Sequence, residues 1–191
     1  MEQYQVCLWV RVKRIVLAFS KLLKKESSSF IVMEKNNVYF SRMKSAWEIR
    51  QIKAKTTYPV RHIVLRKGRP IESCVFEGDV LNSSIHLGAY KNETLVGVLS
   101  AYHKKHPDFN ETKSYQVRGV AVLEAHRKKG IGKLLMEEIE RRLSQMEVSL
   151  LWLNARQTAV PFYQRLSYNV HGDVFNIPHI GPHYCYYKFL L

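Results

Sequence analysis

The sequence predicts an α/β (α+β) domain, and three observations support this class. Apolar runs of strand length alternate with segments of helical spacing between residues 46 and 191. One such run, at residues 120–123, is followed by a glycine-rich turn, Gly130–Ile131–Gly132, and then by a long helical segment. A second run, SLLWLNA at residues 149–155, again precedes a helical segment. Repeated strand–turn–helix units are typical of domains in which helices cover a sheet.

Residues 1–45 are predicted to be a basic extension outside this domain. They contain nine Lys/Arg and three Asp/Glu, and apolar residues recur at helical spacing from Val12 to Leu23, which predicts a basic amphipathic helix. Charges interrupt it too often for a transmembrane span, and no signal-peptide pattern is present. The segment packs on the domain, lies on an anionic membrane, or is an over-extension of the reading frame upstream of Met43. We favour the first and third explanations.

The first half of the domain begins with a strand and a helix. Residues 46–52 alternate apolar and polar side chains, which predicts the first strand. Residues 55–65 predict a short helix that is interrupted near Pro59, because proline has no N–H for the helical ladder. Residues 85–90 and 95–103 then predict a hairpin.

The second half contains the longest elements. Residues 115–123 predict a central strand, and apolar positions recurring from Ile131 to Met146 predict a long helix. Residues 150–153 predict another strand, and Pro161 lies early in the next helix, where its missing N–H is tolerated. The aromatic segment 184–190 predicts the final strand.

Length and composition support one folded domain. A chain of 191 residues with 46% apolar content can bury a substantial core and is not typical of disorder. Cys7, Cys74 and Cys185 are far apart and form neither a metal-ligand spacing nor a disulfide framework. We therefore expect a cytoplasmic protein without a metal.

The turn after residue 123 predicts a phosphate or pyrophosphate site. Glycines at a helix N-terminus expose unpaired N–H groups, allow close approach of a ligand and place it where the helix dipole favours negative charge. Arg127, Lys128, Lys129 and Lys133 add positive side chains around the same point. The turn matches neither the Walker pattern nor the G-x-G-x-x-G dinucleotide pattern.

The turn does match Arg-x-x-Gly-x-Gly, through Arg127, Gly130 and Gly132. It resembles the coenzyme A signature of the GCN5-related N-acetyltransferase (GNAT) superfamily. The motif is short, and alone it also fits an ordinary basic turn before a helix. A second segment, A-x-x-F-Y-x-x-L-S-Y at residues 159–168, is similar to the superfamily's second coenzyme segment in order and separation. Ser167 replaces the usual glycine, which affects a turn and not the chemistry.

The resemblance covers about residues 46–191 and is specific in 118–168. It implies a GNAT fold: a mixed, mostly antiparallel sheet with a splayed central strand pair, flanked by helices. It also implies that freed backbone groups of the central strand bind the pantetheine arm, with the Val122 N–H suited to the thioester oxygen. Val120 and Val122 are equally expected as core residues. The implied coenzyme-binding residues are Val120, Ala121, Val122, Arg127, Lys128, Lys129, Gly130, Ile131, Gly132, Lys133 and Asn154.

The resemblance also assigns candidate catalytic and acceptor-binding residues. Tyr163 corresponds to the tyrosine that protonates the departing thiolate in many relatives, although a buried tyrosine also has structural uses. Asn154 either binds the pantetheine amides or caps a strand end. The I-P-H segment that ends in His179 is similar to a loop that borders the acceptor site in some bacterial members. Independently of the resemblance, Arg118 is an interior arginine on the central strand, which either binds an acceptor carboxylate or pairs with an internal acid.

No general base is identified by the sequence. By residue type the candidates are Glu77, Asp79, His86, Glu124 and His179, and a water relay is common in the superfamily. Glu124 is better explained as a favourable charge in the first turn of a helix.

The sequence thus predicts an acetyl-CoA-dependent N-acetyltransferase that transfers acetyl directly to an amine in a ternary complex. Acetyl-CoA is the cosubstrate, and the acceptor is a small-molecule or peptide amine that the sequence does not identify. The alternative is a non-catalytic acyl-CoA-binding or interaction protein. The net charge of +14 is spread along the chain, which favours steering of polyanionic coenzyme A over nucleic-acid or membrane binding. A homodimer is left open.

Overall fold

The computed structural model describes residues 29–34, 37–42, 47–178 and 180–190, and divides the chain into two compact units, 1–45 and 46–191. In the first unit, β1 (Ser29–Glu34) and β2 (Asn37–Arg42) form an antiparallel pair that the sequence did not predict. The amphipathic helix predicted between Val12 and Leu23 lies outside the described residues. The assignment of residues 1–45 as an extension stays a prediction.

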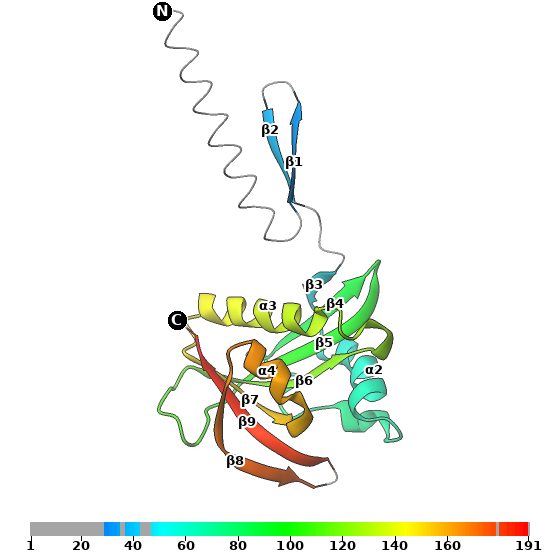
Figure 1. The fold of residues 1–191 in the computed structure, drawn as a ribbon. Coiled ribbons are helices and arrows are strands. Elements are labelled where there is room, and N and C mark those ends of the chain that lie inside the picture. Colours follow the sequence, from blue (N-terminus) through cyan, green and yellow to red (C-terminus); the bar gives the residue numbers. More distant parts are fainter. Residues whose placement is uncertain (1–28, 35–36, 43–46, 179, 191) are drawn as a thin grey trace, which may run out of the picture. The chain divides into compact units, whose positions relative to one another are not determined.

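The second unit is built on one mixed seven-stranded sheet (Figure 1). The spatial order is β3-β4-β5-β6-β7-β9-β8, and every pair is antiparallel except β6–β7. The strands are β3 (Glu48–Gln51), β4 (Ile85–Lys91), β5 (Thr94–His103), β6 (Ser114–Val122), β7 (Leu150–Arg156), β8 (Asn169–Ile177) and β9 (Gly181–Phe189). The predicted mixed, mostly antiparallel sheet is confirmed.

The helices cover both faces of this sheet. Leu135, Ile139 and Leu143 lie one turn apart on α3 (Ile131–Gln145) and are fully buried against the main core, which also includes Tyr163 from α4 (Val160–Arg165). Val60 of α2 (Ala54–Leu65) packs in a separate cluster with residues of β5 and β6. Short 3₁₀ turns complete the fold: η1 (Ile71–Cys74), η2 (Glu124–His126) and η3 (Gln157–Ala159).

The predicted interruption of the first helix is wrong. α2 continues from Ala54 to Leu65 with Pro59 inside it. Pro59 is exposed and lies near the N-terminal end, where the carbonyl left without a helical donor, that of Lys55, is still accessible to water. One missing hydrogen bond at that position does not stop the helix.

The central strands separate along their length. β6 and β7 are paired only from Ser114–Leu150 to Val117–Leu153, yet β6 continues to Val122 and β7 to Arg156. The backbone groups beyond Val117 on this edge therefore have no strand partner. This is the splayed pair that the family resemblance implied.

A β-bulge lies at the point where the strands separate. Arg118 is opposite Ser100 and Ala121 is opposite Val98, so that two residues of β6, Gly119 and Val120, face a single residue of β5. Gly119 has a φ of +66°, the left-handed conformation that this type of bulge requires. The extra residue reverses the alternation of the strand, which brings Val120 to the same core as Val117.

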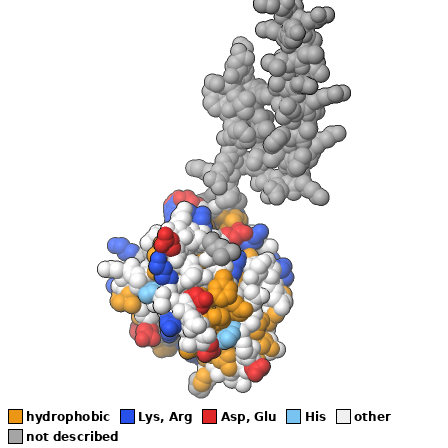
Figure 2. Space-filling model, turned by 90° about the vertical axis from the view of Figure 1, so that its left-hand side faces the viewer, with side chains coloured by type: hydrophobic (Ala, Val, Ile, Leu, Met, Phe, Trp, Pro, Cys, Tyr) orange, Lys and Arg blue, Asp and Glu red, His pale blue; other side chains and the backbone are white. Residues whose placement is uncertain are grey.

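The edge strand β8 was not predicted from the sequence. Seven of its nine residues are exposed, so that no buried face produces an apolar alternation. Figure 2 shows hydrophobic and histidine side chains gathered on one face of this unit. On the edge strand β8, the ring of His171 packs against the ring of Phe109, and His171 Nε2 lies 2.9 Å from the carboxylate of Asp108.

Three side chains in this region, His106, Asp108 and His171, place potential metal-ligand atoms within 4.8 Å of one another. The His106 ring also accepts a 3.2 Å hydrogen bond from the Asp108 N–H. Their contacts with each other and with the aromatic cluster account for their proximity. No helix in the described part of the chain is long and apolar enough to cross a membrane.

Candidate active site

A groove of about 750 Å³ lies where the splayed strands meet the N-terminus of α3 and the helix α4. Its apolar floor includes Val120, Val122 and Phe162. Its positive side chains are Arg127, Lys128, Lys133, Arg156 and Arg165, and none of the described residues that line it is acidic. The groove is therefore suited to a long ligand with an apolar middle and a strongly negative end.

The glycine turn presents unpaired N–H groups to this groove. Gly130 is the N-cap of α3 with a φ of +81°, and the first helical bond runs from the Leu134 N–H to the Gly130 carbonyl at 3.0 Å. The N–H groups of Ile131, Gly132 and Lys133 thus precede the first helical donor and have no helical acceptor. A Cβ at Gly130 would have no atom within 4 Å, so that the space above the turn is open to a ligand.

Gly132 has an additional packing role. A Cβ at this position would lie 3.2 Å from the Phe162 ring, closer than most such contacts. The absence of a side chain at Gly132 lets α3 approach α4. The motif therefore requires glycine for two different reasons. At Gly130 the missing side chain leaves space for a ligand, and at Gly132 it allows α3 to pack closely against α4.

The predicted cationic residues divide into two groups. Lys128 and Lys133 line the groove, as does Arg127, whose Nε also donates to the Val122 carbonyl at 3.2 Å. Lys129 does not line it, and its Nζ donates instead to the Ala125 carbonyl at 2.8 Å. The side chain of Lys129 thus stabilises the turn through this hydrogen bond and does not face the groove.

The ladder between β5 and β6 determines which backbone groups of β6 face the open edge. The Leu123 N–H donates to the Val96 carbonyl, and hydrogen-bonded pairs alternate along antiparallel strands. Val122, opposite Gly97, is therefore a non-hydrogen-bonded pair, and its N–H is directed toward the side that β7 has left. By the same alternation the polar backbone groups of Ala121 face β5.

Tyr163 lies beside the splay. It is buried at 6% exposure, and its ring contacts Phe162, Tyr168 and Tyr186. It lines both the groove and a smaller cavity of about 240 Å³ between the separated strands. Burial, and secondarily Tyr186, raises the pKa of the Tyr163 phenol, which stays protonated at neutral pH. Within the described residues its hydroxyl has no hydrogen-bond partner.

A second cavity of about 460 Å³ lies on the other side of the splay. Arg118, Gly119, Asn154, Arg156 and Leu65 line both this cavity and the small one between the strands. The small cavity shares Val120, Arg156 and Tyr163 with the groove. The three spaces thus follow one another, from the glycine turn, past Tyr163, to the second cavity, which we call the acceptor cavity.

The structure reveals an important group that the sequence did not indicate. Arg61 of α2 is fully buried and donates to the Asp79 carboxylate, to Ser100 and to Tyr102. Burial alone would raise the pKa of Asp79, but the hydrogen bonds from Arg61 and Tyr102 outweigh it and lower the pKa. Asp79 also accepts from the Phe76 N–H at 2.8 Å, so that this network fixes the loop that borders the acceptor cavity.

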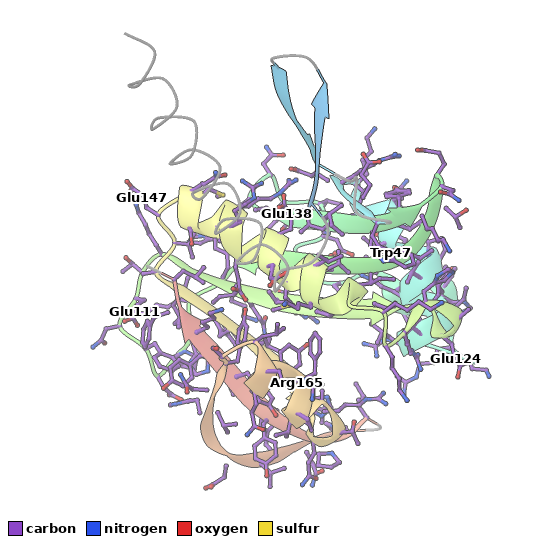
Figure 3. All side chains as sticks on the ribbon, turned by 45° about the horizontal axis from the view of Figure 1, so that its top comes forward. Trp47, Glu111, Glu124, Glu138, Glu147 and Arg165 are labelled. Atoms are coloured by element: carbon purple, nitrogen blue, oxygen red, sulfur yellow. The ribbon has the colours of Figure 1, made fainter. Side chains whose placement is uncertain are left out.

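The general-base candidates differ in whether they line the acceptor cavity and in whether they are already hydrogen-bonded. Among the candidates that the structure describes, only Glu77 lines the acceptor cavity, where it is exposed. Asp79 is committed to Arg61, and buried His86 is bonded to Ser100 and to the Asp79 carbonyl. Glu124 is exposed in η2, at the margin of the domain (Figure 3), and lines none of the three spaces.

Other acceptor-side residues could not be recognised beforehand. His179 lies outside the described residues. His183 of β9 lines the acceptor cavity with its Nδ1 2.8 Å from the Gly181 carbonyl. Gln116 of β6 lines it as well. Neither belongs to a motif, and only the pairing of β9 with β7 brings His183 to the splayed strand.

Comparisons with known proteins agree with this geometry. The model of the acetyltransferase (GNAT) family matches residues 46–168. The Bacillus subtilis (strain 168) protein "Uncharacterized N-acetyltransferase YitI" is 34% identical over 143 residues, which cover 75% of this chain and 96% of that protein.

Solved structures support the fold. An aminoglycoside 6'-N-acetyltransferase complexed with coenzyme A aligns with a TM-score of 0.60 and 14% identity, covering 75% of this chain and 97% of the other. The ribosomal-protein-S18-alanine N-acetyltransferase from Escherichia coli aligns with a TM-score of 0.60 and 14% identity, covering 75% and 94%. The motif, the splayed sheet and these matches lead to one conclusion: the chain belongs to the GNAT family of acetyl-CoA-dependent N-acetyltransferases.

Proposed function

We propose that this protein transfers an acetyl group directly from acetyl-CoA to the amine of an acceptor that is bound at the same time. The observation that supports this best is the continuity of the groove, the small cavity and the acceptor cavity, with Tyr163 and the open edge of β6 between the two ends. Two substrates that enter from opposite ends would meet at the splay.

The groove residues fit coenzyme A. Its pyrophosphate would accept hydrogen bonds from the N–H groups of Ile131, Gly132 and Lys133, in the space that Gly130 leaves open. Lys128 and Arg127 would balance the negative charge. The pantetheine arm would lie along Val120 and Val122, with Asn154 within the small cavity for its amides.

Acyl transfer requires a polarised carbonyl and a protonated leaving group. The Val122 N–H, free of β5 and β7, is the donor we assign to the thioester oxygen. Tyr163 is the donor we assign to the departing sulfur. The raised pKa of Tyr163 keeps the phenol protonated until the sulfur departs. The same dry surroundings would also raise the pKa of the coenzyme thiol, so that the departing thiolate is basic enough to take the phenol proton.

The attacking amine must lose a proton. Glu77 is the acidic side chain that lines the acceptor cavity, and we assign it, directly or through water, as the acceptor of that proton. When the amine nitrogen bonds to the carbonyl carbon, the carbon–sulfur bond breaks and the sulfur takes the proton of Tyr163. No acyl-enzyme is needed.

Initial-rate kinetics test this proposal. Intersecting double-reciprocal plots for acetyl-CoA and the amine are expected for a ternary complex, and parallel plots would overturn direct transfer. Thermal stabilisation by coenzyme A is the preliminary measurement. Tight coenzyme binding without turnover of any amine in a broad screen would favour the alternative, a non-catalytic acyl-CoA-binding protein.

A further inference from the structure

The acceptor cavity has an unusual charge distribution. Four of its lining side chains are Lys or Arg and one is acidic: Arg66, Lys104, Arg118, Arg156 and Glu77. Surface cations are commonly paired with acids, and several unpaired cations around one cavity repel one another. Such an arrangement stabilises nothing by itself and indicates an anionic partner.

Three of the arginines in this region surround one aromatic ring. The guanidinium carbons of Arg61, Arg118 and Arg66 lie 4.1, 4.8 and 5.6 Å from the centre of the Phe76 ring. Of these three arginines, only Arg61 forms an ion pair within the described residues, with the carboxylate of Asp79, which is buried and does not line the cavity. The other two remain available on the cavity side.

Arg118 and Arg156 have no counter-ion among the residues that the structure describes. In the part of the chain that the structure describes, neither side chain forms a hydrogen bond or an ion pair. Arg66 donates only to backbone carbonyls, at 3.3 Å to Ser73 and 3.5 Å to Leu65. Burial lowers the pKa of Arg66, and its cationic neighbours Arg69, Arg118 and Arg156 add to this. These cations therefore act on one another across the cavity.

From this juxtaposition we infer that the acceptor is a small amine that also carries an anionic group, a carboxylate or a phosphate, held by Arg118 with Arg66 and Arg156. The inference rests on the proposed acetyl transfer and specifies the substrate class of its acceptor cavity. Stacking on Phe76 presents the guanidinium of Arg118 as a planar fork, the geometry that carboxylate and phosphate groups prefer.

The same charges assist the chemistry. Nearby cations disfavour the protonated form of an amine and lower its pKa, so that more of the acceptor is neutral and nucleophilic. This effect lessens the need for a strong base, which agrees with Glu77 as the single acid among the described residues that line the cavity. It also disfavours polycations such as polyamines and aminoglycosides, because they add positive charge to an already positive site.

Matched acceptor pairs test the inference with the full chain. Amino acids are compared with their carboxamides and phosphoethanolamine with ethanolamine, and spermidine serves as the polycation. The charged member of at least one pair is expected to have a kcat/KM about tenfold or more above its neutral partner, as for hydrogen bonds to charged groups. The pair that shows the effect distinguishes a carboxylate from a phosphate.

Variants then identify the residue. Arg118→Gln is expected to raise KM for the charged acceptor about tenfold or more, with kcat and acetyl-CoA affinity little changed and the neutral partner unaffected. Arg156→Gln, at an exposed position, repeats the comparison of charged with neutral acceptors if Arg118→Gln folds poorly, and its acetyl-CoA affinity is measured separately because Arg156 also lines the groove. Arg141→Gln on α3 removes the same charge from a residue that does not line the cavity, and it is the control that should leave KM and kcat for both acceptors unchanged.

Calorimetry keeps the test independent of turnover. With coenzyme A bound, N-acetylated amino acids are expected to bind more tightly than their amides, and O-phosphorylated N-acetylethanolamine more tightly than N-acetylethanolamine. Equal binding within both pairs, or preference for neutral amines or spermidine, overturns the inference while acetyl transfer stands. Failure of coenzyme A itself to bind overturns the proposed function instead.

Discussion

At Gly130 the chain combines a φ of +81° with open space where a side chain would begin. We predict that Gly130→Val lowers acetyl-CoA affinity at least tenfold, about 1.4 kcal/mol. The valine would occupy the space in front of the N–H groups of α3. Calorimetric titration of the folded variant measures the loss.

Valine at a positive φ also strains the backbone, and Gly172→Val controls for this. Gly172 has a φ of +67° and nothing within 4 Å of its Cβ position, but it lies on β8 and does not line the groove. Both variants should lose similar stability, and only Gly130→Val should lose affinity. Unchanged affinity in Gly130→Val would exclude the turn as the pyrophosphate site.

Tyr163 gives the second prediction at this scale. Tyr163→Phe should lower kcat roughly 10²-fold or more and leave acetyl-CoA affinity nearly unchanged, because only the proton is removed. Steady-state rates and calorimetry together measure the two quantities. Tyr168→Phe is the matched control, since its hydroxyl is bonded to Glu140 and lines none of the three spaces. A joint loss of turnover and binding would indicate a structural role for Tyr163.

Ser167 occupies the position where the family usually has glycine, and its φ of +63° shows why. The Tyr168 N–H donates to the Tyr163 carbonyl and the Ser167 N–H to that of Gln164, the pattern of a Schellman C-cap. We predict that Ser167→Gly raises the free energy of unfolding by about 0.5–1 kcal/mol, because glycine avoids the steric cost but loses more chain entropy.

Thermal or urea unfolding measures this gain. The same change at a position with an ordinary helical backbone, Ser144→Gly in the last turn of α3, should instead destabilise by about 0.5 kcal/mol. If both substitutions destabilise equally, the serine is not strained.

Among the elements, α3 contains a compact charge network on Glu138 (Figure 3). Arg141 donates to both oxygens of this carboxylate, at 2.8 and 2.9 Å, and Arg142 donates at 2.7 Å. The hydrogen bonds from Arg141 are the main cause that lowers the pKa of Glu138 to about 2; burial opposes them and Arg142 assists them. The folded-state pKa is therefore below the unfolded value of about 4.3.

This network predicts a pH-dependent contribution to stability. At pH 7, Glu138→Gln should lower the free energy of unfolding by about 1 kcal/mol, the upper range for partly exposed pairs. Because the folded pKa is depressed, this difference is complete above about pH 4.5 and should disappear as the pH falls toward 2. Urea unfolding at several pH values measures it, and Glu137→Gln is the control. A difference independent of pH would show that packing, not charge, is responsible.

Elements with a clear period could be predicted from the sequence, and those shaped by neighbours could not. The hairpin β4–β5, the strand β6 and the helix α3 appear within one or two residues of their expected bounds. The bulge at Gly119 is different. It is visible only in the register with β5, and a glycine in a strand has several uses. The edge strand β8 lacks a buried face and therefore lacks the pattern.

The site divides in the same way. The turn at Gly130 could be predicted because its chemistry is local, within a few residues of the chain. The network of Arg61 could not, because Arg61 and Ser100 are 39 positions apart, and only the packing of α2 on β5 joins them. His183 likewise reaches the acceptor cavity through strand pairing alone.

On the scale of the whole molecule, the charge is organised despite its even spread in sequence. The net charge is +14, and the described residues that line the groove and the acceptor cavity include eight Lys/Arg side chains and one acid. Coenzyme A is polyanionic, so that this field favours its approach to the groove. The acceptor cavity extends the same positive potential beyond the splay. Both substrates are thus expected to be anionic.

The last prediction concerns the independence of the second unit. Every residue that lines the groove and the acceptor cavity lies between Val64 and His183, and the family match begins at residue 46. A chain that starts at Met43 is therefore expected to fold and to bind acetyl-CoA as the full chain does. Thermal unfolding and calorimetry of both chains check this. Loss of solubility or of several degrees in Tm would mean that residues 1–42 cover apolar surface of the domain. Flotation of the full chain, but not the shorter one, with anionic vesicles in a salt-dependent manner would instead establish membrane binding, and we expect none at physiological salt.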